Sequence, residues 1–365
     1  MGLKAALKQR LKKNLFYIVY NRNKYFNKDR LDAFVKKYYD QKSVDLNKVK
    51  RALKICYVYG GVRYKEFFAN HFETKTWRER MRLIPCSAQN NLFLQANSKE
   101  WLFLLGNKGK CYETFKIFYG RDVLVVQKEA LGGEGVVSDI ACFVEKHPVF
   151  IVKPLSSAGG IGVKMMDVVS SERDYLHELF DNYPDGFIME ERISQVEEMA
   201  KLHRSSVNTI RIQTINYGDS IEIKWPCLRT GRGESVVDNV YLGGVFVGID
   251  VNSGKTFGQG KDALGRNYTE HPDSKVQLDG FQIPKWEDLC SMLQEMAKIC
   301  PTCRVVGWDM ALTEKGWVMV EANYGPELIY QDISPEGFYE DFIHVRKRLH
   351  ASRFKGYRLE TQFQP

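Results

Sequence analysis

Two carboxylates and one amide near the C-terminal end of the chain have the spacing of a divalent-cation site. The segment VVGWDMALTEKGWVMVEANYGPE, residues 305–327, holds two apolar runs around the polar turn 313–316, which predicts a β-hairpin. Folding it back about the turn brings Asp309 within about one residue of the position opposite Glu321, and Asn323 projects to the same face as Glu321. Oxygen ligands of this kind suit Mg²⁺. The alternative is that Asp309 ends a strand and Glu321 is simply exposed, and the hairpin alone favours neither.

A glycine-rich segment is the second candidate, because it follows an apolar strand that ends in a lysine. The pattern predicts this strand over residues 149–153, with Lys153 last, and the loop SSAGGIGV (156–163) follows it. Backbone N–H groups and a positive charge can bind phosphate oxygens, and glycines let the backbone approach them closely. The spacing differs from the P-loop and dinucleotide fingerprints. A glycine-rich turn without a ligand is the alternative.

Acidic and basic residues at strand positions could hold the rest of a nucleotide. The predicted strand GFIMEE (186–191) ends in Glu190 and Glu191, where a nucleobase or ribose could bind through backbone groups and one carboxylate. A solvated strand end is the alternative. Arg211 lies on the β-rich run 209–217, and an inward-facing arginine on a strand needs an anionic partner such as a phosphate or acyl phosphate.

The segment RTGRGESVVDNVYLGG, residues 229–244, combines glycines with Arg229, Arg232, Asp238 and Asn239. A loop of this composition could close over a substrate. The two arginines could equally be surface residues.

The elements that position these residues change in type along the chain. Helix-period apolar spacing with few Gly or Pro predicts three or four helices in residues 1–80. From about residue 100, short apolar runs predict strands mixed with helices: 101–105 as a strand or short helix, strands at 122–127, 209–217, 220–228 and 241–251, and helices at 139–146 and 286–299. Antiparallel hairpins among mixed strands and helices predict an α+β fold.

Composition indicates a soluble cytoplasmic protein with a large core. The chain has 365 residues, 44% of them hydrophobic and 27% charged. No apolar run approaches the roughly 18 to 20 residues of a membrane span, and the N-terminus lacks the apolar region of a signal peptide. Eight scattered cysteines suit reduced thiols. The lone CxxC formed by Cys300 and Cys303 is weak evidence for zinc or redox chemistry.

Basic residues interleaved with tyrosine and phenylalanine concentrate between residues 1 and 82, and the net charge of the chain is +8. This charge could attract a membrane surface, a polyanionic glycan or a nucleic acid. The favoured interpretation is a set of amphipathic helices whose aromatic side chains pack inward. We expect no nucleic-acid partner, because no nucleic-acid-binding motif accompanies the charge.

Taken in order, these pieces resemble the ATP-grasp superfamily, and specifically the sugar-transfer-associated ATP-grasp family of polysaccharide-synthesis clusters. The resemblance covers about residues 104 to 327. Its matching pieces are Gly106-Asn107-Lys108, Lys153-Pro154 with Gly159-Gly160 and Gly162, Met189-Glu190-Glu191, Ser206 to Arg211, Asp238-Asn239 with Gly243-Gly244, and Trp308-Asp309 with Glu321 and Asn323.

The resemblance implies a role for each matching residue. ATP contacts would come from Lys108, Lys153, Ser157, Gly159, Gly160, Glu190, Glu191 and Glu198, with Glu190 or Glu191 on the adenine and Glu197 or Glu198 on the ribose. Two Mg²⁺ ions would be held by Asp309, Glu321 and Asn323, with Glu321 bridging. Arg211 and Arg232 would steady the transferred phosphoryl group, with Asn239 as a further catalytic residue.

The same resemblance implies two α+β lobes that clasp ATP, preceded by a helical region. The expected divisions are a basic, mainly helical region at 1–95, lobes at 96–190 and 191–345, and a basic tail at 346–365. The implied activity is a carboxylate–amine ligase that acts through an acyl phosphate on a sugar or glycan precursor. The alternatives are an ATP-grasp kinase and a non-catalytic glycan-binding protein. The basic N-terminus could also place the protein at the inner face of a membrane, and the oligomeric state stays open.

Overall fold

The computed structural model describes residues 45–60, 62, 64–157, 160–169, 174–235, 238, 243–326, 328, 331–334 and 337–351. These residues fall into two compact units, one formed by the chain up to 94 with 261–267 and 327–351, the other by 95–260 and 268–326. The helices expected before residue 45, Gly159 and Asn239 of the expected ATP site, and the tail 352–365 lie outside the described residues. No helix in the described ranges is long and apolar enough to cross a membrane.

The first unit is mainly helical where it is described. Its elements are α3 (Leu46–Gly60), α4 (Tyr64–Ala69), α5 (Trp77–Met81), α6 (Cys86–Ala96), η4 (Gln331–Ile333) and α13 (Tyr339–Ala351). Helices α3 and α4 pack through buried side chains, among them Val49, Leu53, Phe67 and Phe68. Among the described residues between 45 and 80, the helical prediction is confirmed by α3, α4 and α5.

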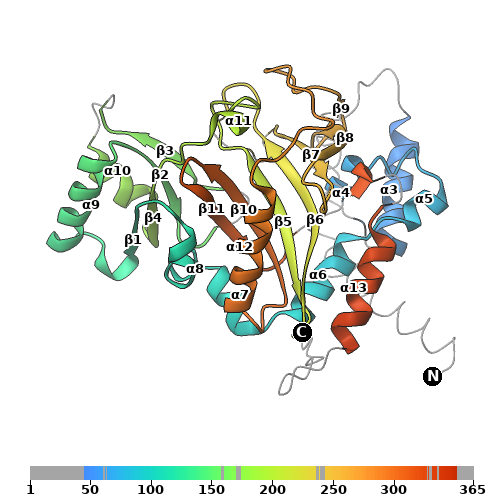
Figure 1. Cartoon of the computed structure of the whole chain (residues 1–365), viewed down its shortest axis with the longest axis horizontal. Coiled ribbons are helices and arrows are strands. Elements are labelled where there is room, and N and C mark those ends of the chain that lie inside the picture. Colours follow the sequence, from blue (N-terminus) through green and yellow to red (C-terminus); the bar gives the residue numbers. More distant parts are fainter. Residues whose placement is uncertain are drawn as a thin grey trace. The chain divides into compact units, whose positions relative to one another are not determined.

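In the second unit, the described residues form a small antiparallel sheet of four strands in the order β1-β4-β2-β3. The strands are β1 (Val123–Gln127), β2 (Val149–Pro154), β3 (Lys164–Asp167) and β4 (Gly186–Glu191). Helices α9 (Glu134–Lys146) and α10 (Tyr175–Asn182) lie on one face of this sheet (Figure 1), where Phe150 and Phe187 pack with Ile140 and Leu179. Because side chains alternate along a strand, Ile151, Lys153 and Glu190 belong to the other face.

A larger sheet has seven strands within the described residues, in the order β11-β10-β5-β6-β7-β8-β9. The strands are β5 (Thr209–Asn216), β6 (Ile221–Thr230), β7 (Val245–Ile249), β8 (Thr256–Lys261), β9 (Asn267–Tyr268), β10 (Val305–Thr313) and β11 (Gly316–Asn323). The remaining elements of this unit are α7 (Lys99–Leu105), α8 (Lys108–Phe115), η1 (Lys116–Phe118), η2 (Lys128–Ala130), α11 (Glu197–Ala200) and α12 (Trp286–Ile299).

One face of the larger sheet is the main hydrophobic core. Helix α12 lies against β5 and β6 (Figure 1), and Ile210, Trp308 and Met310 are fully buried with Leu289 and Leu293 of that helix. The neighbours of these strand residues in the sequence must therefore face the opposite way. This alternation puts charged side chains on the second face.

The predicted elements largely appear. The helix 286–299 and the hairpin around residue 314 are confirmed, and 101–105 is helical. The helix expected at 139–146 begins earlier, at Glu134, directly after Gly133, which takes the N-cap position. The strand expected at 241–251 is shorter, because β7 covers only Val245–Ile249 and residues 241–242 are not described.

Candidate functional site

Three charged side chains form a row across neighbouring strands of the larger sheet. Asp309 on β10 lies directly opposite Glu321 on β11 and directly opposite Arg211 on β5. Asn323 lies opposite Gly307. It is two residues after Glu321 on β11 and therefore on the same face. The predicted hairpin register is therefore confirmed, although a bulge after Asp309 interrupts it. The bulge keeps Glu321 on the charged face while Met319 returns to the core.

Asp309 is buried between two arginines. Its carboxylate accepts hydrogen bonds from Nε and Nη2 of Arg211, the latter at 2.7 Å, and from Nη1 of Arg229 at 3.2 Å to each oxygen. Burial alone would raise the pKa of Asp309, but the charges of the two guanidinium groups outweigh it and hold that pKa below its usual range. The aspartate is thus ionised and fully hydrogen-bonded.

The charge network continues beyond Asp309. Arg229 Nη2 donates to Asp238 at 2.8 Å, and Asp238 also accepts a hydrogen bond from the Thr209 hydroxyl. Burial lowers the pKa of Arg229, yet the charges of Asp238 and Asp309 raise it overall. The sequence placed Arg229 and Asp238 only in a glycine-rich loop. Their pairing with Asp309 depends on strand register, and no local signal could have found it.

Lys108 links the hairpin to the beginning of the glycine loop. It is the first residue of α8, which Asn107 caps by accepting a hydrogen bond from the Lys110 N–H at 3.0 Å. Lys108 Nζ donates to the Ser157 carbonyl at 2.6 Å and lies 3.8 Å from Glu321 Oε1. Burial, the largest influence, lowers the pKa of Lys108. Three residues expected in the ATP site therefore meet here.

Glu190 joins Lys153 in a second ionic cluster. Its carboxylate lies 2.8 Å from Lys153 Nζ and accepts a hydrogen bond from Arg121 Nη2 at 2.6 Å. Burial raises the pKa of Glu190, but the charges of Arg121 and Lys153 lower it to about 2. Arg121 also donates to the Met319 carbonyl at 2.6 Å, which ties β4 to β11. Arg121 could not be found from the sequence, because its partners lie 69 and 198 positions away.

Apolar side chains share the sheet face that carries Lys153. Ile151 lies two residues before Lys153 and pairs directly with Met165 on β3. Met165 is 41% exposed, so this apolar surface is open to solvent. A flat heterocyclic ring could pack on this apolar surface beside the lysine.

Glu191 points away from Glu190, as neighbouring strand residues must. Its carboxylate accepts the Asp122 N–H at 3.0 Å, and His147 Nε2 lies 2.9 Å from Asp122 Oδ2. The structure therefore does not bring the Glu191 side chain to Lys153. Glu198 is exposed on the short helix α11, and Gly160 has a φ of +78°, a backbone conformation that favours glycine.

Oxygen donors in this cluster can be compared with the needs of Mg²⁺. Glu321 has a side chain that is 36% exposed, so its carboxylate oxygens are open to a cation. Asn323 can offer a cation only its amide oxygen, because its buried Nδ2, which has no hydrogen-bond partner among the described residues, is a donor. Asp309 already accepts four contacts from two arginines, which uses the acceptor capacity of a carboxylate. Asp309 fits only if it gives up one of these contacts.

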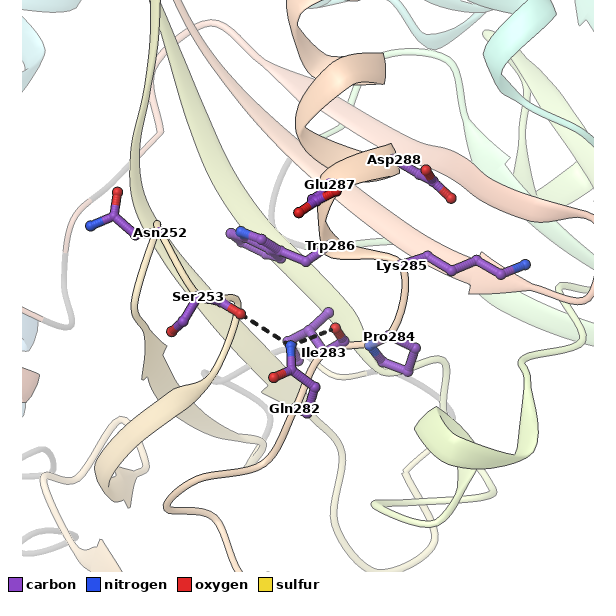
Figure 2. Close-up of a pocket in the computed structure, with 9 residues that line it drawn as sticks. All are labelled: Asn252, Ser253, Gln282, Ile283, Pro284, Lys285, Trp286, Glu287 and Asp288. Atoms are coloured by element: carbon purple, nitrogen blue, oxygen red, sulfur yellow. Dashed lines mark hydrogen bonds between the residues drawn. The ribbon is translucent and has the colours of Figure 1, made fainter.

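The surface hollow in Figure 2 is a different place. It has a volume of about 350 Å³ and is lined by residues 252–253 and 282–288, none of which belongs to the charged cluster. Gln282 Nε2 donates to the Ser253 carbonyl at 3.1 Å across it. Glu287 and Asp288 place two carboxylates in this hollow against one lysine, which makes it unsuited to a polyphosphate.

The two cysteines of the CxxC segment belong to the core. Both are buried, and burial raises the pKa of the Cys300 thiol to about 12 and that of Cys303 well above its ordinary value. Cys300 Sγ lies 3.6 Å from the Met296 carbonyl at the end of α12. These are packing residues and not reactive thiols.

Comparison with known proteins gives one family match. A family model described as sugar-transfer associated ATP-grasp matches residues 87–346. Among solved structures, D-alanine–D-alanine ligase from Helicobacter pylori has 14% sequence identity and a TM-score of 0.42, with 71% of this chain and 64% of that chain covered. D-cycloserine synthetase DcsG has 10% identity and a TM-score of 0.42, with 70% and 73% covered. An ADP complex of N5-carboxyaminoimidazole ribonucleotide synthetase has 10% identity and a TM-score of 0.41, with 65% and 53% covered.

The chain thus spans less than two thirds of the first and third of these structures. No curated protein has a sequence that matches it.

Proposed function

The chain belongs to the sugar-transfer associated ATP-grasp family, and on that basis we propose that it is an ATP-dependent ligase that joins a carboxylate to an amine. The observation that carries the proposal is that Lys108 contacts both the glycine loop and the hairpin. Its ammonium group contacts Ser157 at the start of the glycine loop and lies 3.8 Å from Glu321 on the hairpin. A cation on helix α8, the start of the glycine loop and a carboxylate of the hairpin thus lie together, as a bound metal–polyphosphate requires.

Each part of the nucleotide has a matching group in this arrangement. The apolar surface of Ile151 and Met165 would hold the adenine, and Lys153 and Lys108 would bind phosphate oxygens. Glu321 and Asn323, with Asp309, would hold Mg²⁺, which when bound neutralises phosphate charge and orients the terminal phosphoryl group. Arg211 and Arg229 lie next to Asp309 and would stabilise the negative charge that develops on that group.

The proposed reaction has two steps. A carboxylate oxygen of the first substrate attacks the γ-phosphorus of ATP, the bond to the β–γ bridging oxygen breaks, and ADP leaves. The amine nitrogen then attacks the acyl carbon, inorganic phosphate leaves, and the nitrogen gives up a proton, so that an amide forms. These steps need no covalent nucleophile from the protein, which works by positioning and by charge stabilisation. The family association supports a carboxylate on a sugar or glycan precursor as the first substrate.

A substrate screen with a matched control tests the proposal. Purified protein with Mg-ATP would be offered uronic-acid sugars and amino acids, alone and together, with phosphate release and product mass measured. We expect ADP and an amide only when both substrates are present, and no turnover in Glu321→Ala. Glu314→Ala, on the exposed turn of the same hairpin, is the control. A stable phosphorylated product formed without any amine would contradict the ligase proposal and indicate a kinase.

A further inference from the structure

Side chains, rather than other backbone groups, bind the backbone on both sides of Arg232. Strand β6 ends at Thr230, and the next three residues are Gly231, Arg232 and Gly233. The Gly231 carbonyl accepts a hydrogen bond from one imidazole at 2.9 Å, and the Gly233 carbonyl accepts from another at 2.8 Å. Their N–H groups donate to a hydroxyl at 3.2 Å and to a carboxylate at 2.6 Å. The four side chains are His271, His203, Ser206 and Asp273.

The hydrogen bonds fix both imidazoles as the neutral Nε2–H form. His203 Nδ1 accepts the Ser206 N–H at 3.2 Å, so its proton must be on Nε2, which faces Gly233. His271 Nδ1 faces the N–H groups of Asp273 and Ser274, both at 3.3 Å, so its proton is on the Nε2 that faces Gly231. Each ring can therefore donate to a carbonyl beside Arg232.

The buried side chains pack closely on Gly231. A Cβ atom there would lie 2.4 Å from Ser206 Oγ and 2.8 Å from His203 Nδ1, so a larger residue would displace one of these groups. The two rings also stack on each other, with centroids 5.9 Å apart. Both histidines are buried, and His271 has no exposed surface. The backbone beside Arg232 is thus held by three buried side chains, those of His203, His271 and Ser206, and by the exposed carboxylate of Asp273.

The side chain of Arg232 extends from this backbone to Tyr268, whose hydroxyl accepts a hydrogen bond from Nη1 at 2.7 Å. Arg232 lies three residues after Arg229, which binds Asp309, so the two Cα atoms are at most about 10 Å apart. Tyr268 is on β9 and Asp309 on β10, on opposite sides of β6 in the sheet, so the Arg232 side chain must leave Tyr268 to span much of that distance. Fixing its backbone removes entropy that binding of an anion would otherwise cost.

We propose that His203 and His271 are positioning residues that hold Arg232 where it meets the terminal phosphoryl group of a bound nucleoside triphosphate. This inference rests on the proposed function, because it needs the nucleotide to lie at the Asp309 hairpin. It gives the two buried histidines, which the ligase mechanism does not use, the role of positioning Arg232 as a third arginine beside Arg211 and Arg229.

Binding of two nucleotides measures the effect without turnover. Titration calorimetry measures the dissociation constants of Mg-ADP and of the Mg complex of the β,γ-imido analogue of ATP. Their ratio is the preference for a third phosphate. We expect Arg232→Ala to lower this preference about tenfold or more, and His203→Ala or His271→Ala to lower it about fivefold. Affinity for ADP should change less than twofold. His177→Ala, at an exposed histidine on α10, is the matched control.

Two further comparisons separate positioning from a general effect on the fold. In the Arg232→Ala background, His203→Ala should have no additional effect on the preference, and His203→Gln should keep the wild-type preference because its amide can replace the Nε2–H donor. His203→Asn has a shorter side chain and should lose it, so this pair carries the test if the alanine variants do not fold. Equal losses for ADP and the triphosphate analogue, or additive losses in the double variant, would overturn the inference.

Failure of the inference can be told from failure of the proposed function. If the wild-type protein binds neither nucleotide, the proposed function and the inference both fall. If it binds both nucleotides and Arg232→Ala keeps the wild-type preference, only the inference falls.

Discussion

Replacing Glu190 with glutamine should destabilise the protein by about 3 kcal/mol. The carboxylate is buried between Arg121 at 2.6 Å and Lys153 at 2.8 Å, and its pKa falls from an ordinary 4.5 to about 2. This difference, at about 1.4 kcal/mol per pH unit, corresponds to about 3 kcal/mol. An independent expectation for breaking a buried ion pair, about 3–5 kcal/mol, agrees, because the variant leaves two cations without their common anion.

Urea unfolding of wild type and Glu190→Gln as a function of pH measures this quantity. The folded pKa of Glu190 lies below its unfolded pKa, so its contribution is fully present above pH 4.5 and is lost as the pH falls toward about 2. We therefore expect a difference of about 3 kcal/mol at pH 7 that shrinks below pH 4.5. Glu145→Gln, at an exposed position of α9, should change stability by less than about 0.5 kcal/mol.

Nucleotide should partly rescue the variant. If Lys153 binds phosphate, Mg-ADP restores an anion beside the uncompensated lysine and should raise the Tm of Glu190→Gln more than that of wild type. A Glu190→Gln protein as stable as wild type at pH 7, or a difference that does not depend on pH below 4.5, would refute the electrostatic argument.

Three other predictions concern Glu321, two cysteines and His271. Glu321→Ala should abolish Mg-ATP turnover and change the free energy of unfolding by less than about 1 kcal/mol, because its contact with Lys108 at 3.8 Å is partly exposed; unchanged turnover would refute the metal assignment. Cys142, which is exposed, should react with a thiol reagent in the native protein while the buried Cys303 stays protected. Peptide mass mapping measures this, and labelling of Cys303 with Cys142 unlabelled would contradict the fold. Burial lowers the pKa of His271, near Asp273, His203 and Arg232, below 6.5. The contribution of His271 to stability should therefore be present above pH 6.5 and fall as the pH drops through the folded pKa. The difference in unfolding free energy between wild type and His271→Gln should then shrink on acidification. A difference that does not change with pH would contradict this.

Local patterns were sufficient wherever the signal lies within one element or one turn. The hairpin is an example: a short polar turn between two apolar runs sets which residues lie opposite each other, so Asp309 and Glu321 could be paired before the fold was known. The order of the glycine loop, the acidic strand end and the hairpin indicated the family, and the family match over residues 87–346 confirms it. The roles of the individual site residues stay predictions.

Side-chain direction separates the residues that the structure brings together from those it does not. Glu190 and Glu191 are equivalent in the sequence, but only Glu190 shares a sheet face with Lys153. Strand alternation implied that they point apart. It could not say which of them faces the site, because that depends on which face the helices cover.

The sequence by itself determined the local elements and the residue types from which the site is built, because periodicity, turn residues and hairpin register act between near neighbours in the chain. Tertiary structure alone decided which charges are paired. Arg121 reaches Glu190 across 69 positions and Arg211 reaches Asp309 across 98. Buried charges must find partners wherever the fold brings them together, and the fold, rather than the spacing in the sequence, sets those distances.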